Sequence, residues 1–271
     1  MQQRKGITLN FETIRLTTDA RGIAEVTLDR PDKHNAMNAQ MIAELSDAAR
    51  TLSADDAVRV VVLRAEGPSF CAGGDLGWMR AQAEKDRAGK IEEASALAEM
   101  LGLWNVLPKP LIGRVHGAAY GGGLGLVAVC DVVVAEEATR FALTETRLGL
   151  IPATIGPFVV GRMGQAFARQ VFFTGKPFNT AFLVRAGLVA RSCCADELDA
   201  AVEDEILSVL GCAPGAIARA KALCRALVGT DPAEAAHLSA NALADCWETD
   251  ETQEGIAAFF AKETPSWRQA S

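Results

Sequence analysis

The sequence of 271 residues lacks the features of a nucleic-acid-binding or zinc-binding protein. Acidic residues outnumber basic ones by 34 to 27, so the net charge is −7, and no block of lysine and arginine is present. A surface that neutralises phosphate groups needs such a block. The three histidines and seven cysteines include no C-x-x-C pair, which argues against zinc. We therefore expect neither nucleic acid nor a metal among the ligands.

Long apolar segments are also missing. The N-terminal segment MQQRKGITLNFETI has no apolar stretch of the length that a signal peptide needs, and no run of about 18 apolar residues occurs. The odd number of cysteines favours a reducing compartment over a disulfide framework. With 49% hydrophobic and 23% charged residues, the composition is that of a globular protein. We expect a cytoplasmic protein without a membrane partner.

The first two thirds of the chain alternate between strand and helix patterns. Residues 12–28 alternate around a turn at Gly22, which predicts a β-hairpin. Asn38 is a plausible N-cap for a helix over 39–52, whose apolar face comprises Met41, Ile42, Leu45, Ala48, Ala49 and Leu52. Short apolar runs predict buried strands at 58–64, 111–115, 131–135 and 140–143. The fold class is therefore α/β.

The remaining segments favour helices. Residues 79–107 form a helical stretch with a polar first half, which we expect to be exposed and able to move, and an apolar second half. From about residue 197 strand patterns end, and helices are predicted over 198–210, 213–229, 231–248 and 251–263. Asp231 and Pro232 are a typical helix start. These helices form an appendage that should dock on its own core or on a neighbouring subunit.

Two glycine-rich loops each follow a short predicted strand. They are AEGPSFCAGGD at 65–75 and HGAAYGGG at 116–123, the second leading into a short apolar helix. Such loops can aim several backbone N–H groups at one oxygen atom. They can equally serve only tight turns and close packing, and their spacing does not distinguish the two. Gly123, Gly125 and Ala128 also fit a relaxed dinucleotide motif, but two predicted strands precede its acidic partner, Glu145, which disfavours that alternative.

Six motifs together resemble the enoyl-CoA hydratase/isomerase (crotonase) family: LDRPDKHNAMN, PSFCAGGDLGWM, VHGAAYGGGLGL, CDVVVA, TETRLGLIPA and FFAKETPSW. The resemblance covers roughly residues 11–268. It implies a spiral of β-β-α units that binds acyl-CoA, residues 1–196, followed by a C-terminal helical trimerisation region, residues 197–271. It also implies self-association as a trimer or hexamer.

The resemblance further implies a catalytic site. The backbone N–H groups of Gly74 and Gly122 would hold the thioester oxygen, and a Cβ in the glycine stretch would crowd the thioester. Hydratases of the family commonly use two glutamates. The second corresponds to Glu145, whereas Gly125 stands at the position of the first, so Glu145 would have to act alone. Without the resemblance, Glu145 reads as a solvated acid or an ion-pair partner of Arg147.

Other residues have weaker expectations. The resemblance implies contacts with the CoA part of the substrate from Lys33, His34, Ala72, Asp75, Leu76 and Lys262, although a surface lysine is as readily explained by solvation. Trp78 and Met79 would line either the acyl pocket or the core. We expect Asp75 and Asp131 to satisfy local backbone groups, His116 to pack within its loop, and Cys71 and Cys130 to be small core residues.

The reaction implied is hydration of an enoyl-CoA thioester, without a cofactor beyond the CoA carried by the substrate. GGGLGL, TETRLGLIPATIGPFVV and KETPSW look most like the methylglutaconyl-CoA hydratases of leucine breakdown and the related isohexenylglutaconyl-CoA hydratases. Two alternatives stay open. One is a double-bond isomerase, and the other is a non-catalytic acyl-CoA-binding scaffold.

Overall fold

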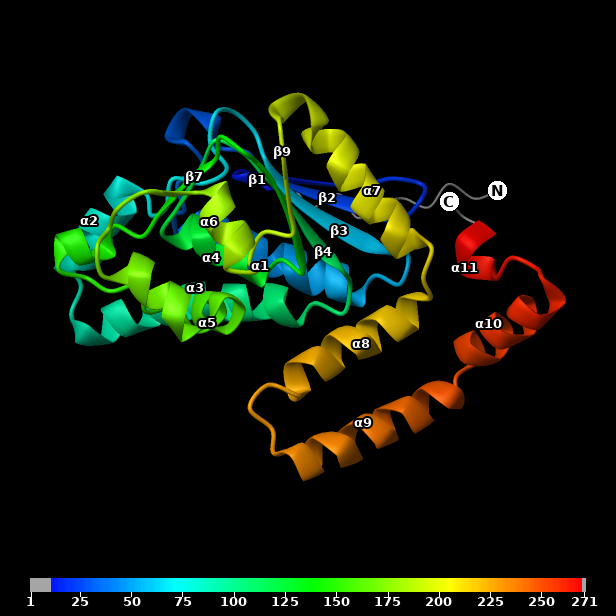
Figure 1. The fold of residues 1–271 in the computed structure, drawn as a ribbon. Helices are drawn as coiled ribbons and strands as arrows, with labels where there is room; N and C mark the ends of the chain where they lie inside the picture. The colour runs from blue at the N-terminus through cyan, green and yellow to red at the C-terminus, as the bar shows by residue number, and fades with distance from the viewer. Residues whose placement is uncertain (1–10, 270–271) are drawn as a thin grey trace.

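A computed structural model describes residues 11–269, and its centre is a six-stranded sheet (Figure 1). The strand order is β1-β2-β3-β4-β6-β9, in which β1 is antiparallel to β2 and all other neighbours are parallel. The strands are β1 Ile14–Thr18, β2 Ile23–Leu28, β3 Val60–Ala65, β4 Leu111–Val115, β6 Val132–Glu136 and β9 Arg191–Cys193. The predicted hairpin is confirmed as β1–β2, with Gly22 at a φ of 81° in its turn.

Side chains of successive residues in the central strands are buried on opposite faces of this sheet. In β3, Val61 and Leu63 belong to the larger core cluster, whereas Val60 and Val62 belong to the smaller one. This alternation follows from the two-residue repeat of a strand. Because both faces are covered, the parallel strands read as continuous apolar runs, which is why the sequence predicted them.

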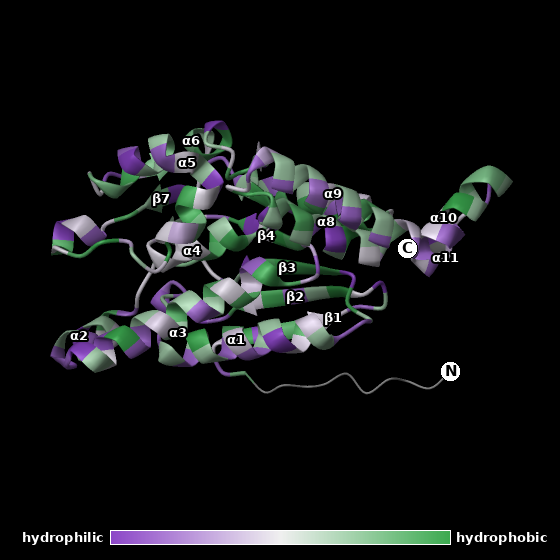
Figure 2. Ribbon diagram, turned by 90° about the horizontal axis from the view of Figure 1, so that it is seen from below, coloured by the Kyte–Doolittle hydropathy of each residue, from purple (hydrophilic) through white to green (hydrophobic). Residues whose placement is uncertain are grey.

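The larger cluster lies under a layer of helices. These are α1 Ala39–Ala54, α2 Leu76–Glu84, α3 Arg87–Val106, α4 Gly122–Val129, α5 Gly156–Phe172 and α6 Thr180–Arg185. Figure 2 shows apolar colour concentrated in the strands and mixed colour along the outer helices. The side chain of Asn38 accepts a hydrogen bond from the Met41 N–H at 2.9 Å, which confirms the predicted N-cap of α1. The six predicted face residues of α1 are all buried.

A second, three-stranded sheet lies beside the first. Its order is β5-β7-β8, with β5 Ala118–Tyr120, β7 Arg140–Ala142 and β8 Phe178–Asn179. Only β7 was predicted, because β5 and β8 have two or three residues and carry no periodic signal. Short 3-10 helices occur at Pro31–Lys33, Glu145–Leu148 and Ala195–Glu197. The predicted helix after the glycines is confirmed as α4, whose last seven residues are all buried.

The C-terminal helices divide into one that packs on the sheet and others that extend away from it. α7, Leu198–Leu210, contributes Leu198, Val202 and Ile206 to the smaller core cluster. α8 Pro214–Ala226, α9 Pro232–Trp247, α10 Asp250–Ala261 and α11 Ser266–Gln269 form an arm below and to the right of the core in Figure 1. Asp231 caps α9 as predicted. The domain boundary after residue 196 stays a prediction.

The helices within residues 11–269 were compared with the length and apolar character that a membrane crossing needs. No single helix there has both the length and the apolar character for a membrane crossing. The bent pair Ala195–Leu210 and Pro214–Ala226 meets these criteria jointly, on length and composition only.

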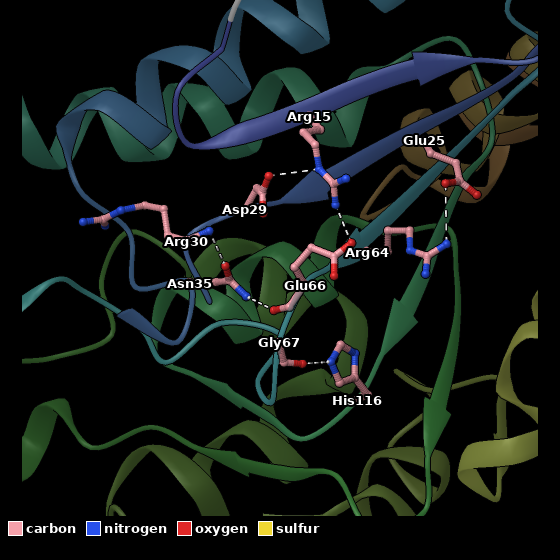
Figure 3. A network of polar contacts seen from close by, with 9 residues as sticks. All are labelled: Arg15, Glu25, Asp29, Arg30, Asn35, Arg64, Glu66, Gly67 and His116. Carbon is pink, nitrogen blue, oxygen red and sulfur yellow. Dashed lines mark hydrogen bonds and ion pairs between the residues drawn. The ribbon is translucent and has the colours of Figure 1, made fainter. Parts of the chain in front are cut away.

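A polar network fastens the loops that follow β2 and β3 (Figure 3). Asn35, which is fully buried, donates through Nδ2 to the carbonyl oxygens of Glu66 and Ser69, both at 2.8 Å. Its Oδ1 accepts the Arg30 N–H at 2.8 Å. Arg15 pairs with Asp29 at 2.9 Å and also with Glu66. The two loops therefore form one cross-linked body at the edge where the candidate site lies.

Candidate active site

The second glycine loop and Glu145 are brought together by strand pairing. β5 and β7 run parallel, and their pairing ends at Tyr120 opposite Ala142. The Gly121 N–H then donates to the Ala142 carbonyl oxygen at 2.9 Å. Because carboxyl ends of parallel strands open at the same edge, the residues that follow each strand become neighbours. A Cβ built on Gly121 would lie 3.2 Å from Oε1 of Glu145.

The first glycine loop is attached to the same edge from two sides. Cys71 forms a parallel bridge with Ala119 of β5, and the Tyr120 N–H donates to the Cys71 carbonyl oxygen at 2.9 Å. On the other side Met37 forms a parallel bridge with Gly74. The two glycine loops come into contact, since a Cβ on Gly121 would be 3.8 Å from the Cα of Gly73.

Both predicted donors have free backbone N–H groups. The Met37 N–H donates to the Gly73 carbonyl oxygen at 2.7 Å, and the Met37 carbonyl oxygen accepts the Asp75 N–H at 2.8 Å. Because these bonds lie on either side of Gly74, the Gly74 N–H points away from Met37. Gly122 is the first residue of α4, where an N–H has no partner within the helix. Neither N–H donates to another residue within 11–269. The positive end of the α4 dipole adds to the attraction for a negative oxygen.

At Gly122 and Gly123 the protein's own packing explains the glycine, which corrects the expected reason at those two positions. Gly121 has a φ of 47° and a ψ of −118°, a conformation that side chains disfavour. A Cβ on Gly122 would overlap the Met37 methyl group, and one on Gly123 would lie 2.6 Å from the Cys71 carbonyl oxygen. Thus the Cβ directions at Gly122 and Gly123 point at protein atoms, not at space left for a thioester.

Glu145 is a partly buried carboxylate without an ion-pair partner in the described chain. It begins a 3-10 helix after β7, and its Oε2 is buried without a hydrogen bond from residues 11–269. Burial raises the pKa of Glu145, and its own backbone N–H opposes this rise to a smaller extent. Arg147 instead lies against Gly175. A carboxyl group of this kind can both accept and return a proton.

The position of the family's other glutamate is closed. A Cβ on Gly125 would lie 2.5 Å from Cγ2 of Ile155 and 3.3 Å from Cδ1 of Leu101. Gly125 itself is buried within α4. The space that a second carboxylate would occupy is filled by these two apolar side chains.

The candidate CoA-contacting residues fall into two groups. Lys33, His34, Ala72 and Asp75 lie on the cross-linked loops, and Leu76 is the first residue of α2 directly after them. The Ala72 N–H donates to the His34 carbonyl oxygen at 2.9 Å. Lys262 ends α10, which lies at the far end of the arm from α2 in Figures 1 and 2. One chain therefore does not bring Lys262 to the loops. All six assignments stay predictions.

Several neighbours of the loops have structural partners. The side chain of Asp75 caps α2 through the Gly77 and Trp78 N–H groups and pairs with Arg30 at 3.1 Å. Burial alone would raise the pKa of Asp75, but these bonds hold it below its usual range. His116 Nε2 lies 2.8 Å from the Gly67 carbonyl oxygen (Figure 3). Both arrangements fit the expected structural roles.

The two loop cysteines are core residues, as expected. Cys71 and Cys130 are fully buried, and burial raises the pKa of each thiol to about 12. A thiol of that pKa is protonated at neutral pH and is a poor nucleophile.

A cavity of about 630 Å³ lies away from this site, between α5, the end of α3 and α8. Its lining includes none of the residues Gly74, Gly122 and Glu145. Lys221 of α8 lines the cavity, and its Nζ binds Oδ2 of Asp131 at 2.6 Å. Burial lowers the pKa of Lys221, and Asp131 opposes this. We place the chemistry at the glycine loops, because free N–H groups and a partly buried carboxylate converge there.

No cluster of three or more metal-ligating side chains occurs within 11–269.

Sequence reasoning missed the residues that hold the loops. Met37, Arg30 and Asn35 lie in the motif LDRPDKHNAMN, in which roles are predicted only for Lys33, His34 and Asn38. Asn35 has a φ of 53°, and a buried asparagine in that conformation reflects side-chain bonds to the backbone. The position of Asn35 after a proline-containing turn was the available signal.

Comparisons with known proteins agree with this geometry. The sequence model of the family described as "Enoyl-CoA hydratase/isomerase" matches residues 18–270. A "Probable enoyl-CoA hydratase" of Rhizobium meliloti is 32% identical over 266 residues, covering 94% of this chain and 97% of that protein. Two solved structures, an enoyl-CoA hydratase from Shewanella pealeana and Pseudomonas aeruginosa AtuE, each have a TM-score of 0.91 and 35% identity. Each match covers 95% of this chain. It covers 96% of the Shewanella pealeana chain and 100% of the AtuE chain. The predicted α/β crotonase-like fold is confirmed.

Proposed function

Because the chain belongs to the enoyl-CoA hydratase/isomerase family, we propose that it adds water across the α,β double bond of an enoyl-CoA thioester. The observation that carries the proposal is that two free backbone N–H groups, one on each glycine loop, and the partly buried Glu145 carboxylate lie where the two loops meet beyond β5 and β7. Such a site can stabilise negative charge on a thioester oxygen and move a proton close by.

In the proposed reaction, Glu145 orients a water molecule and removes its proton as the oxygen attacks C3. The electrons of the double bond move towards the thioester oxygen, where the Gly74 and Gly122 N–H groups hold the resulting enolate. The proton taken by Glu145 is then returned to C2, so that H and OH are both added. The raised pKa of Glu145 favours the first transfer, because it makes the carboxylate a stronger base towards the proton of water.

Apolar side chains around the site fit an acyl substrate. Leu76 follows the first loop and is 83% exposed, and Leu148, Leu150 and Ile151 follow Glu145 and are also exposed. Burying such side chains against an acyl chain is favourable, at about 25 cal/mol per Å². Among substrates, 3-methylglutaconyl-CoA from leucine breakdown is our first candidate, on the resemblance of the GGGLGL and TETRLGLIP segments.

The leading alternative is double-bond isomerisation. It is favoured by the single carboxylate, since moving a proton between two carbon atoms needs one acid–base group. A panel of enoyl-CoA thioesters distinguishes the reactions through loss of enoyl absorbance combined with product mass. Hydration adds the mass of water, and isomerisation leaves the mass unchanged. Binding without either change would indicate a non-catalytic acyl-CoA scaffold and would contradict the proposal.

The proposal includes no metal or redox cofactor, because conjugation with the thioester already makes C3 electrophilic.

We further propose a cytoplasmic location, on the basis of the free cysteines, and assembly as a trimer or hexamer. Exposed aromatic side chains on the arm support assembly. Phe259 and Phe260 of α10 are 78% and 79% exposed.

A further inference from the structure

Met37 contacts both predicted oxyanion donors, although it belongs to neither glycine loop. Its side chain is 1% exposed and belongs to the larger core cluster. The residue lies just before α1, in the loop that Asn35 and Arg30 cross-link to the first glycine loop. Its position is therefore fixed from the surrounding backbone.

The backbone of Met37 sets the direction of the first donor. The N–H of Met37 donates to Gly73, and its carbonyl oxygen accepts from Asp75, at 2.7 Å and 2.8 Å. These two bonds clamp the residues on either side of Gly74. The Gly74 N–H is left between them, facing away from Met37.

The side chain of Met37 packs against the second donor. Its Cε methyl group occupies the place where a Cβ of Gly122 would be, and its Sδ lies 3.7 Å from that position. The Cα of Gly122 therefore rests on a buried methyl group. Well-packed interiors transmit such contacts because few voids exist to absorb a displacement.

We propose that Met37 is a positioning residue that fixes the spacing of the two oxyanion donors, with its backbone holding Gly74 and its thioether holding Gly122. The inference rests on the proposed function, since it assumes that both N–H groups bind the thioester oxygen. Met37 does not touch the reacting atoms. It acts through the two glycines.

The test is a double-mutant cycle with Met37→Ala and Gly122→Ala. Met37→Ala keeps the backbone clamp but removes the methyl group behind Gly122, and Gly122→Ala forces a methyl group into the occupied space. We expect each single variant to lower kcat at least about tenfold and to change KM less. The loss should not exceed the ~10²–10³-fold decrease in kcat that follows removal of one whole donor. In the double variant the new methyl group fills the vacated space, so we expect kcat above that of either single variant. Contacting residues show such non-additivity.

Met41→Ala is the matched control, since Met41 is also fully buried and loses the same atoms from α1. It should lower Tm comparably, leave kcat unchanged and fail to rescue Gly122→Ala. If Met37→Ala does not fold, Met37→Leu replaces it, because leucine has a similar volume but branches at Cγ and does not extend to the position of the Met37 Cε.

A spectroscopic readout separates this inference from the proposed function. In a Glu145→Gln background, bound crotonyl-CoA should absorb at longer wavelength when its carbonyl group is polarised by both donors. Met37→Ala should shrink this shift, and Gly122→Ala added to it should restore part of it. The role of Met37 would be overturned if the kcat losses of the two single variants simply multiply in the double variant. It would also be overturned if Met37→Ala leaves the spectrum of bound crotonyl-CoA unchanged. Failure of the unmodified protein to hydrate any enoyl-CoA would instead contradict the proposed function.

Discussion

At the residue scale, the site depends on which positions carry no side chain. Gly125→Glu would place a carboxylate against Ile155 and Leu101, which already fill that space. We expect a loss of about 1–3 kcal/mol in the free energy of unfolding from overpacking alone, with a further penalty for the buried charge. No gain in hydration is expected, since the carboxylate has no room to face the substrate.

Urea unfolding of Gly125→Glu tests this, with Gly102→Glu as the control. A Cβ on Gly102 of α3 would meet no atom within 4 Å, so that variant should keep the parent stability. A stable and faster Gly125→Glu enzyme would show that a second carboxylate does fit.

The raised pKa of Glu145 has a consequence for the pH dependence of activity. The base form exists only above the raised pKa, so kcat/KM should fall on the acid side at a pH above 4.5, the ordinary pKa of glutamate. Because the folded state binds this proton more tightly than the unfolded state, Glu145 lowers stability as the pH rises from its unfolded pKa through its folded pKa. Glu145→Gln should therefore gain Tm over the parent across that window. An acid limb centred at or below 4.5 would contradict the assignment.

At the element scale, α2 is attached to the molecule by few contacts. It has no buried residue, and the Trp78 Nε1–H donates to Oε2 of Glu93 in α3 at 3.0 Å, while Lys85 also binds Glu93. Trp78→Phe removes the donor but keeps an aromatic ring. A hydrogen bond to a charged group contributes about 1.5–3 kcal/mol, so amides of 76–84 should exchange about tenfold faster or more.

Hydrogen exchange measures this directly, and Trp247→Phe is the control, because Trp247 is 59% exposed on the arm. Tm should change little in either variant. Unchanged protection of α2 in Trp78→Phe would mean that another contact holds the helix.

How far elements were predictable depended on their length and burial. α1, the hairpin and the buried strands carry strong periodic patterns, and each occurs within a few residues of its predicted range. The stretch 79–107 was predicted as one helix, but it breaks at Lys85 and Asp86, where the Asp86 side chain caps α3. β5 was missed because its three residues gain their pairing from partners far along the chain.

The candidate site also divides into features that the sequence predicted and features that only the packing explains. The glycine loops and Glu145 were located through the family resemblance, whereas the reasons for the glycines emerged only from the packing of Met37 and Cys71. Contacts between residues about 85 positions apart leave no local pattern in a single sequence.

At the scale of the whole molecule, the arm formed by α8–α11 exposes apolar side chains that the core does not cover. Figure 2 shows strongly apolar colour at one end of α10, and the exposed residues of α9 and α10 include Leu243, Trp247, Phe259 and Phe260. We expect a homo-oligomer, measured by light scattering at micromolar concentration. Phe260→Asp should shift the population towards smaller species.

Phe173→Asp is the control for assembly. Phe173 is 66% exposed but lies at the C-terminal end of α5 and not on the arm. It should leave the assembly unchanged. A parent protein that scatters as a stable monomer would contradict the role given to the arm.

The central claim, that Glu145 alone moves the proton in hydration, is tested most directly by single turnover of Glu145→Gln. The amide is nearly isosteric but cannot accept the proton of water. On a thioester that the parent hydrates, we predict that affinity measured by calorimetry is largely kept while the hydration rate falls about 10²-fold to 10⁴-fold, the usual contribution of general acid–base catalysis. Hydration by Glu145→Gln at the parent rate would contradict the account.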